Sequence, residues 1–164
     1  WRVENLPLIA VALVLALSVP LALTDIREHR LPNPLTLLAI LLSAVLVLLA
    51  GILTASWFQL ALAFIAGGIT LGLGYLMAMV NGIGMGDVKY LVAVNILLGW
   101  FSPWLILPML AIGFTLASLV SLGLIITRRA NLKTPIAMGP FLMFGFAFVA
   151  LELFAPVVTV AGGS

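Results

Sequence analysis

Six apolar runs, separated by short polar segments, fill almost the whole chain. They cover residues 6–24, 34–53, 59–80, 88–101, 104–127 and 137–160. All but the fourth hold about 20 residues or more, the length that an α-helix needs to cross a hydrocarbon core of about 30 Å. We therefore predict an all-α membrane protein: one bundle of six transmembrane helices, forming a single domain over residues 1–164.

The composition supports this prediction and removes several function classes. Hydrophobic residues make up 65% of the chain and charged residues 7%, whereas average soluble domains are about 25% charged. The absence of cysteine excludes disulfides, thiolate metal sites and thiol nucleophiles, and one histidine cannot form a metal cluster. We expect no metal and no cofactor, and the net charge of +2 shows no nucleic-acid footprint.

The fourth run is too short to cross a bilayer on its own. Its 14 residues would give a helix of roughly 21 Å. Either this helix is buried among its neighbours, or its start lies below the lipid headgroups, which would draw Asp87 toward the hydrocarbon level.

Local signals add detail to the second and third runs. Asn33 as a cap, followed by Pro34 at the first helical position, predicts the start of the second helix. In the third, Gly68 and Gly72 have the small-xxx-small spacing of a close-packing seam, and two more glycines lie nearby.

The positive charges fall in alternate loops. One side of the predicted bundle carries six of the seven cations: Arg27, Arg30, Lys89, Arg128, Arg129 and Lys133. The positive-inside rule makes that side cytoplasmic and leaves both termini on the other side. All four tryptophans then lie at the opposite membrane interface, where they would form part of an aromatic belt. They are Trp1, Trp57, Trp100 and Trp104.

This topology brings Asp25 and Asp87 to the same side at similar depth, although about sixty residues separate them. Each has a structural interpretation as well. Asp87 could cap the fourth helix, and Asp25, placed after the first helix, could form an ion pair with Arg27 or Arg30.

As a pair, the two aspartates also suit peptide hydrolysis. Carboxylates a few ångströms apart cannot both ionise comfortably, so they share a proton and provide one base and one acid. The base would activate a water and the acid would protonate the scissile carbonyl, without metal or cofactor.

The residues around both aspartates resemble a known family. Gly84-Met85-Gly86-Asp87 is a GxGD motif, followed by Val88-Lys89, and Asp25 is followed by Arg30-Leu31-Pro32-Asn33. GxGD alone is weakly specific, but the combination resembles the type IV prepilin peptidases. The resemblance covers essentially the whole chain and includes a proline-glycine segment at residues 137–141.

The resemblance implies a membrane aspartyl endopeptidase of the bacterial inner membrane. Such enzymes remove the short basic leader of type IV prepilins and type II secretion pseudopilins at the cytoplasmic face. Asp25 and Asp87 would be the catalytic pair, and Gly84 and Gly86 would keep the backbone open beside an extended substrate. Lys89 would tune the charge of Asp87, or it is simply a snorkelling lysine.

A further expectation concerns the larger members of this family. Larger members of the family add a cysteine-containing cytoplasmic domain and methylate the new N-terminus. Nothing in these residues matches that domain, so the chain resembles the compact, peptidase-only members.

The alternative function is an ion- or proton-coupled transporter that uses intramembrane aspartates. An inverted repeat in the sequence would favour this alternative. A catalytically silent scaffold is a third possibility.

Overall fold

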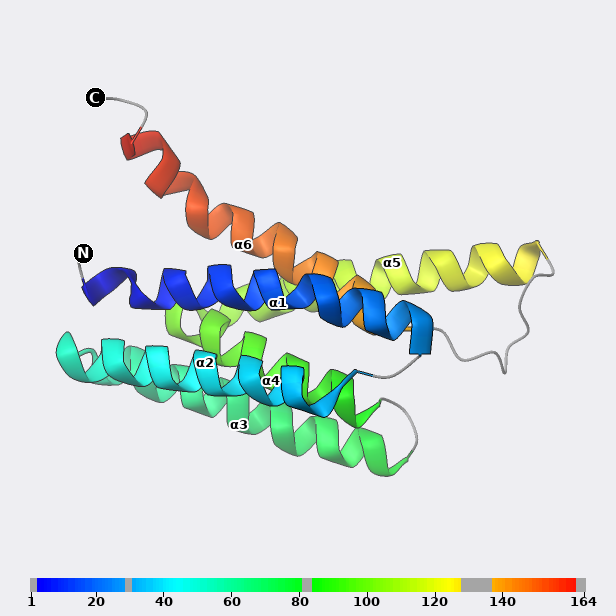
Figure 1. Ribbon diagram of the computed structural model, residues 1–164, viewed down its shortest axis with the longest axis horizontal. Helices are drawn as coiled ribbons and strands as arrows, with labels where there is room; N and C mark the ends of the chain where they lie inside the picture. The colour runs from blue at the N-terminus through cyan, green and yellow to red at the C-terminus, as the bar shows by residue number, and fades with distance from the viewer. Residues whose placement is uncertain (1–2, 29–30, 81–83, 128–136, 162–164) are drawn as a thin grey trace.

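The computed structural model describes residues 3–28, 31–80, 84–127 and 137–161, and these are all-helical (Figure 1). The six α-helices of the described residues follow one another in this order: α1 Leu6–Glu28, α2 Asn33–Leu53, α3 Trp57–Met79, α4 Met85–Phe101, α5 Ile106–Ile126 and α6 Gly139–Ala161. Two short 3₁₀ helices precede α1 and α5: η1 Val3–Asn5 and η2 Pro103–Leu105. The prediction of six helices is confirmed.

Within the part of the chain that the structure describes, four segments are long and apolar enough to cross a membrane by themselves. They are α1, α2, α3 and the continuous segment Pro103–Ile126 that joins η2 to α5. The chain is therefore a multi-pass membrane protein. α4 has 17 residues and is shorter than these segments.

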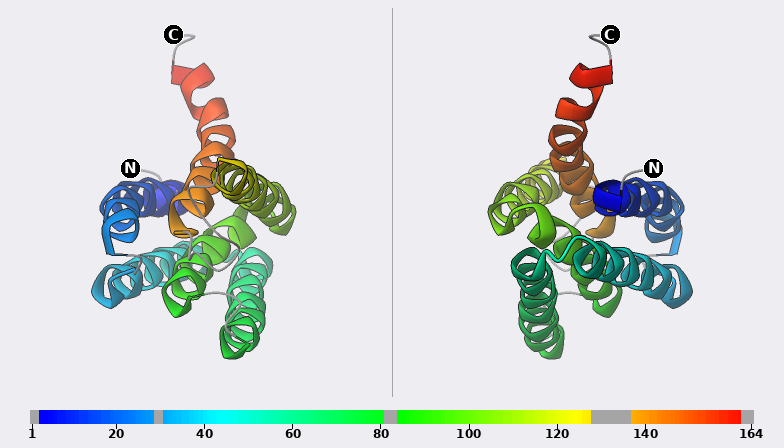
Figure 2. Two further views of the ribbon diagram at one scale, coloured as in Figure 1. Left: turned by 90° about the vertical axis from the view of Figure 1, so that its right-hand side faces the viewer. Right: turned by 90° about the vertical axis from the view of Figure 1, so that its left-hand side faces the viewer.

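The short helix α4 lies at the centre of the bundle. It contacts α1, α2, α3, α5 and α6, and Figure 2 shows it between the surrounding helices. Every residue from 90 to 99 is buried. Burial among neighbours, one of the two explanations offered for the short fourth run, therefore describes α4, because a helix enclosed by others need not match the bilayer thickness.

Glycines set how closely α3 and α4 approach, but they are not the glycines that the spacing predicted. A β-carbon on Gly67 would lie 2.6 Å from Ile96, and one on Gly74 would lie 2.5 Å from Val88. Gly68 and Gly72 have nothing within 4 Å of that position. The seam predicted at Gly68 and Gly72 is wrong, because these two residues lie on the side of α3 that faces away from α4.

One end of the bundle gathers the segments that the topology prediction placed together. The end of α1, the start of α2, the end of α3 and the start of α4 meet there, while the start of α1 and the α2–α3 turn lie at the other end (Figure 1). α6 leans away from the other helices toward its C-terminal end (Figures 1 and 2). Several residues used in the prediction lie outside the described ones: Trp1, His29, Arg30, Arg128, Arg129 and Lys133.

Candidate active site

The two aspartates sit on the facing ends of α1 and α4. Asp25 belongs to the last turn of α1, which continues to Glu28 instead of ending before Asp25 as predicted. Its side chain is 5% exposed. Asp87 lies in the first turn of α4 and is half-buried. Asp87 is not the N-cap residue of α4, which is Gly84, but its place in the first turn suits the positive end of the helix dipole.

The start of α6 supplies a hydrogen bond to Asp25. The backbone N–H of Gly139 donates to Asp25 Oδ2 at 3.1 Å, and Gly139 is the first residue of α6. The first N–H groups of a helix have no partner within it and lie at the positive end of its dipole. This contact stabilises the charged form of Asp25, which otherwise sits at the unfavourable, negative end of α1.

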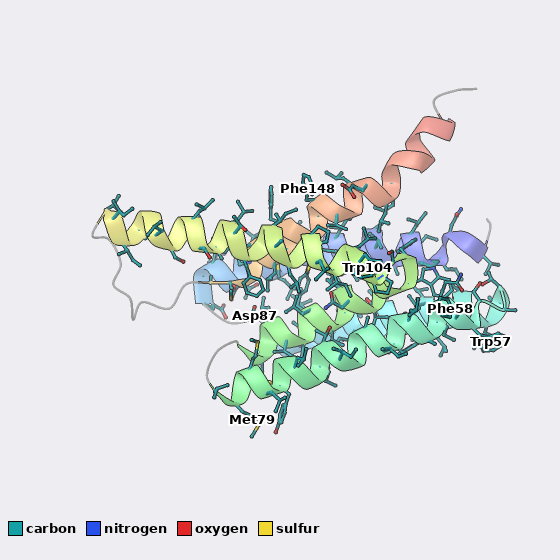
Figure 3. The ribbon with its side chains drawn as sticks, turned by 180° about the vertical axis from the view of Figure 1, so that it is seen from behind. Trp57, Phe58, Met79, Asp87, Trp104 and Phe148 are labelled. Atoms are coloured by element: carbon teal, nitrogen blue, oxygen red, sulfur yellow. The ribbon has the colours of Figure 1, made fainter. Side chains whose placement is uncertain are left out.

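Gly139 also marks the space between the two carboxyl groups. A β-carbon there would lie 2.7 Å from Asp25 Oδ2 and 3.5 Å from Asp87 Oδ1, so the separation of these two oxygens cannot exceed the sum of those distances. Figure 3 shows Asp87 at the start of α4, on the side of that helix where α1 ends. Because glycine has no side chain, the space that both oxygens border stays open.

Two carboxyl groups this close oppose each other's ionisation. The negative charge of one raises the free energy of charging the other, so the pair holds a single proton more readily than none. The N–H of Gly139 donates to Asp25 and favours the negative charge there. The arrangement can therefore provide a base at Asp25 and a proton donor at Asp87.

A buried hydrogen bond holds α1 and α4 in register beneath the aspartates. Ser18 Oγ donates to the Val14 carbonyl at 2.8 Å, which uses its only proton, so the Tyr90 hydroxyl is the donor in the 2.9 Å bond between Tyr90 and Ser18. Ser18 lies two turns before Asp25, and Tyr90 lies about one turn after Asp87, each on the same face as its aspartate.

The start of α4 is also attached to the segment that leads into α2. Lys89 Nζ donates to Asn33 Oδ1 at 2.8 Å. A β-carbon on Gly86 would lie 2.7 Å from the β-carbon of Leu31, so glycine allows this close approach. Asn33 is not the cap of α2, because the N-cap residue is Pro32 and no side chain caps that helix.

The residues assigned to the site from the sequence thus occupy different places. Asp25 and Asp87 come together, Gly86 and Lys89 fasten α4 to the start of α2, and Gly84 is the exposed N-cap residue of α4. The first residues of the glycine-rich stretch, 81–83, lie outside the described residues.

Comparison with known protein families finds a match over most of the chain. Residues 9–127 match the type IV leader peptidase family. This chain belongs to that family. The matched residues run from α1 to the end of α5 and include both aspartates and the GxGD motif. No curated protein and no solved structure matches the chain.

Membership makes the chain a leader-peptidase-like protease of the membrane, with pilin-like proteins as the substrates that the family implies. It gives no support to the transporter alternative. α6 and Gly139 lie beyond the matched residues, so the contribution of α6 to this candidate site comes from the structure alone.

Sequence reasoning missed three residues of this site. Gly139 belongs to the proline-glycine segment, which has no predicted role in catalysis, and the sequence assigns no role to Ser18 or Tyr90. Ser18 and Tyr90 are polar residues within apolar runs. Ser18 lies two turns from Asp25 and Tyr90 lies one turn from Asp87, and this spacing is the signal that could have indicated them.

Proposed function

We propose that Asp25 and Asp87 are the catalytic pair of an aspartyl endopeptidase that cleaves the leaders of type IV prepilins or pseudopilins. The observation that carries the proposal is the approach of the two carboxyl groups to one space beside Gly139, in a member of the leader peptidase family.

In the proposed reaction, a water lies between the two carboxyl groups. Asp25, charged and held by Gly139, takes a proton from this water as its oxygen attacks the scissile carbonyl carbon. Asp87 gives its proton to the carbonyl oxygen, which forms a neutral tetrahedral intermediate. When the carbon–nitrogen bond breaks, Asp25 returns the proton to the leaving nitrogen and Asp87 recovers its own from the hydroxyl.

The substrate segment that reaches the pair is extended. A helical peptide bond is enclosed by its own hydrogen bonds and side chains, so the residues beside the aspartates must leave the helical conformation. Gly84 and Gly86 would lie beside this extended segment, where main-chain hydrogen bonds can hold it. Lys89, fastened to Asn33, keeps the start of α4 in place beside it.

The orientation follows from charge. The end of the bundle that carries the aspartates would face the cytoplasm of a bacterial cell, by the positive-inside rule, and the basic leader of the substrate would remain there while its apolar helix stays in the inner membrane.

Product analysis tests this function directly. The purified chain, in lipid nanodiscs, is incubated with a substrate that joins a basic leader to an apolar helix, and the products are weighed by mass spectrometry. We expect one cut, at the boundary between leader and helix. An intact substrate, or cuts scattered along the leader, would contradict the proposal.

A further inference from the structure

The first turn of α4, which carries Asp87 (Figure 3), has few contacts of its own to keep it folded. Every residue from 90 to 99 is buried, whereas Val88 is the only buried residue from Met85 to Lys89. The N-cap residue is Gly84, which has no side chain to bond the free N–H groups of the turn. Helix ends with few buried contacts open most readily. The position of Asp87 therefore depends on contacts from outside α4.

Two contacts join this turn to the segment that leads into α2. Lys89 Nζ donates a hydrogen bond to Asn33 Oδ1 at 2.8 Å. Gly86 lies so close to Leu31 that a β-carbon on Gly86 would be 2.7 Å from the β-carbon of Leu31. Gly86 and Lys89 are three residues apart, so they lie on one side of α4. Asp87 lies between them in the sequence, so the contacts hold the turn both before and after it.

Asn33 is well placed to anchor this bond, because the backbone around it is rigid. A proline stands on each side of it, and the proline ring fixes the backbone φ angle. The carbonyl of Pro32 accepts from the N–H groups of Leu35 and Thr36, both at 3.2 Å. The hydroxyl of the buried Thr36 donates to the carbonyl of Asn33 at 3.0 Å. The Asn33 side chain therefore starts from a fixed point.

The direction of Lys89 favours a role for its bond over a role for its charge. Successive residues of an α-helix are about 100° apart, so Lys89 and Asp87, two residues apart, do not face each other. The ammonium binds the neutral side chain of Asn33. A neutral acceptor holds Lys89 without adding a third negative charge beside the two aspartates.

We propose that Asn33 and Lys89 are positioning residues: their hydrogen bond takes the place of a side-chain cap and keeps the first turn of α4 folded, so that Asp87 stays in place. The inference rests on the proposed leader peptidase function, in which Asp87 is the proton donor. Lys89 then acts through this bond, and neither tunes the charge of Asp87 nor merely extends its ammonium to water.

Hydrogen exchange tests the bond without relying on activity. Deuterium uptake is followed by mass spectrometry in a peptide that covers the start of α4, with the protein in detergent. Lys89→Met removes the donor and Asn33→Ala removes the acceptor, and we expect both to exchange about tenfold faster there, the factor that corresponds to about 1.4 kcal/mol. Arg27→Met removes an exposed cation from the last turn of α1. This matched control should exchange at the native rate.

Steady-state kinetics test whether the bond positions Asp87. Lys89→Met and Asn33→Ala should each lower kcat about tenfold and leave KM near its native value, because Asp87 acts on the scissile bond. The double variant should be no slower than either single variant, because both substitutions break the same bond. Asn33→Asp keeps an acceptor oxygen and should retain most of the native kcat, and Arg27→Met should retain all of it.

The pH–rate profile distinguishes the bond from the charge of Lys89. If the charge mattered, Lys89→Met would move the profile to higher pH, because losing a nearby positive charge favours protonated carboxyl groups. Asn33→Ala, which keeps the ammonium, would then have the native kcat. We expect instead the same loss of kcat in both variants, with the profile unmoved. A shifted profile in Lys89→Met, with native kcat in Asn33→Ala, would overturn the proposal.

The outcomes separate this proposal from the proposed function. If the native chain cleaves no leader substrate, the proposed function fails, and hydrogen exchange alone decides whether the bond holds the first turn of α4. If the native chain cleaves its substrate, but exchange or kcat is native in both Lys89→Met and Asn33→Ala, the function stands and the pair does not position Asp87.

Discussion

Gly139 gives the site both a hydrogen-bond donor and an open space. Its N–H holds Asp25, and a β-carbon in its place would meet oxygens of both aspartates. We predict that Gly139→Ala lowers kcat for leader cleavage by about 100-fold, since displacing catalytic groups by about 1 Å can cost that much. Gly68→Ala is the matched control, because nothing lies within 4 Å of its β-carbon. Equal activity in the two variants would contradict this role for Gly139.

Tyr90 and Ser18 make a prediction about stability. Tyr90→Phe leaves Ser18 bonded to the Val14 carbonyl, so only one hydrogen bond is lost, at about 1 kcal/mol. Ser18→Ala leaves the fully buried Tyr90 hydroxyl without this partner, which costs about 1–3 kcal/mol. Thermal unfolding in detergent should rank Ser18→Ala below Tyr90→Phe, with the double variant no lower than Ser18→Ala. The reverse ranking would show that the bond does not hold α1 and α4 together.

At the scale of single residues, the sequence indicates which charged residues belong to the candidate site more readily than which glycines do. Asp25 and Asp87 are conspicuous in an apolar chain, and topology alone brings them to one end. Gly139 cannot be found that way, because its role depends on how the start of α6 packs against the ends of α1 and α4, and no local pattern encodes that contact.

At the scale of elements, α4 is the helix around which the others pack, and its contact with α3 depends on glycine. A β-carbon on Gly99 would lie 2.8 Å from the Ala66 β-carbon and 3.0 Å from backbone atoms of Ala63 and Leu62. Gly99→Ala should lower the free energy of unfolding, because overpacking costs about 1–3 kcal/mol and outweighs the helix propensity gained, about 1 kcal/mol.

The matched variant for Gly99→Ala is Gly72→Ala, whose β-carbon meets nothing within 4 Å and which should unfold no earlier than the native chain. Measuring both by thermal unfolding in one detergent decides the point. If Gly72→Ala is the more destabilised of the two, the open face of α3 is in fact packed.

The helices also show what sequence patterns can predict about packing and what they cannot. The short fourth run predicted an unusual helix, and burial at the centre explains it. The spacing of Gly68 and Gly72 did not reveal which face of α3 meets a partner, because glycines one position apart on a helix point about 100° apart. Only the packing of α3 against α4 distinguishes Gly67 and Gly74 from them.

At the scale of the whole molecule, the bundle has two chemically different ends. Asp87 lies toward one end and Trp57 at the other (Figure 3), and Asp25, in the last turn of α1, is at the same end as Asp87. We predict that Glu28→Cys faces the cytoplasm and Ala55→Cys the opposite side, both residues being exposed. A membrane-impermeant thiol reagent added to intact cells should label Ala55→Cys and leave Glu28→Cys unlabelled until the cells are opened. The opposite pattern would invert the proposed topology.

The sequence predicted the six helices and which of their ends lie together, because apolar length and the alternation of sides act over the whole chain; which end faces the cytoplasm stays a prediction from loop charge. It could not predict the apolar groove that α3, α4 and α5 line, because the groove depends on the angles between helices far apart in sequence.

The account depends most on the joint action of Asp25 and Asp87. Its most direct test is the rate of leader cleavage by Asp25→Asn and Asp87→Asn, with Glu28→Gln as the matched control on the same end of the bundle. Asparagine keeps the shape of the side chain but cannot take up or release the proton, so each aspartate variant should lose at least about 10²-fold, the lower bound for a general acid or base. Glu28→Gln should keep native activity. A native rate in a folded Asp25→Asn or Asp87→Asn variant would contradict the two-carboxylate mechanism.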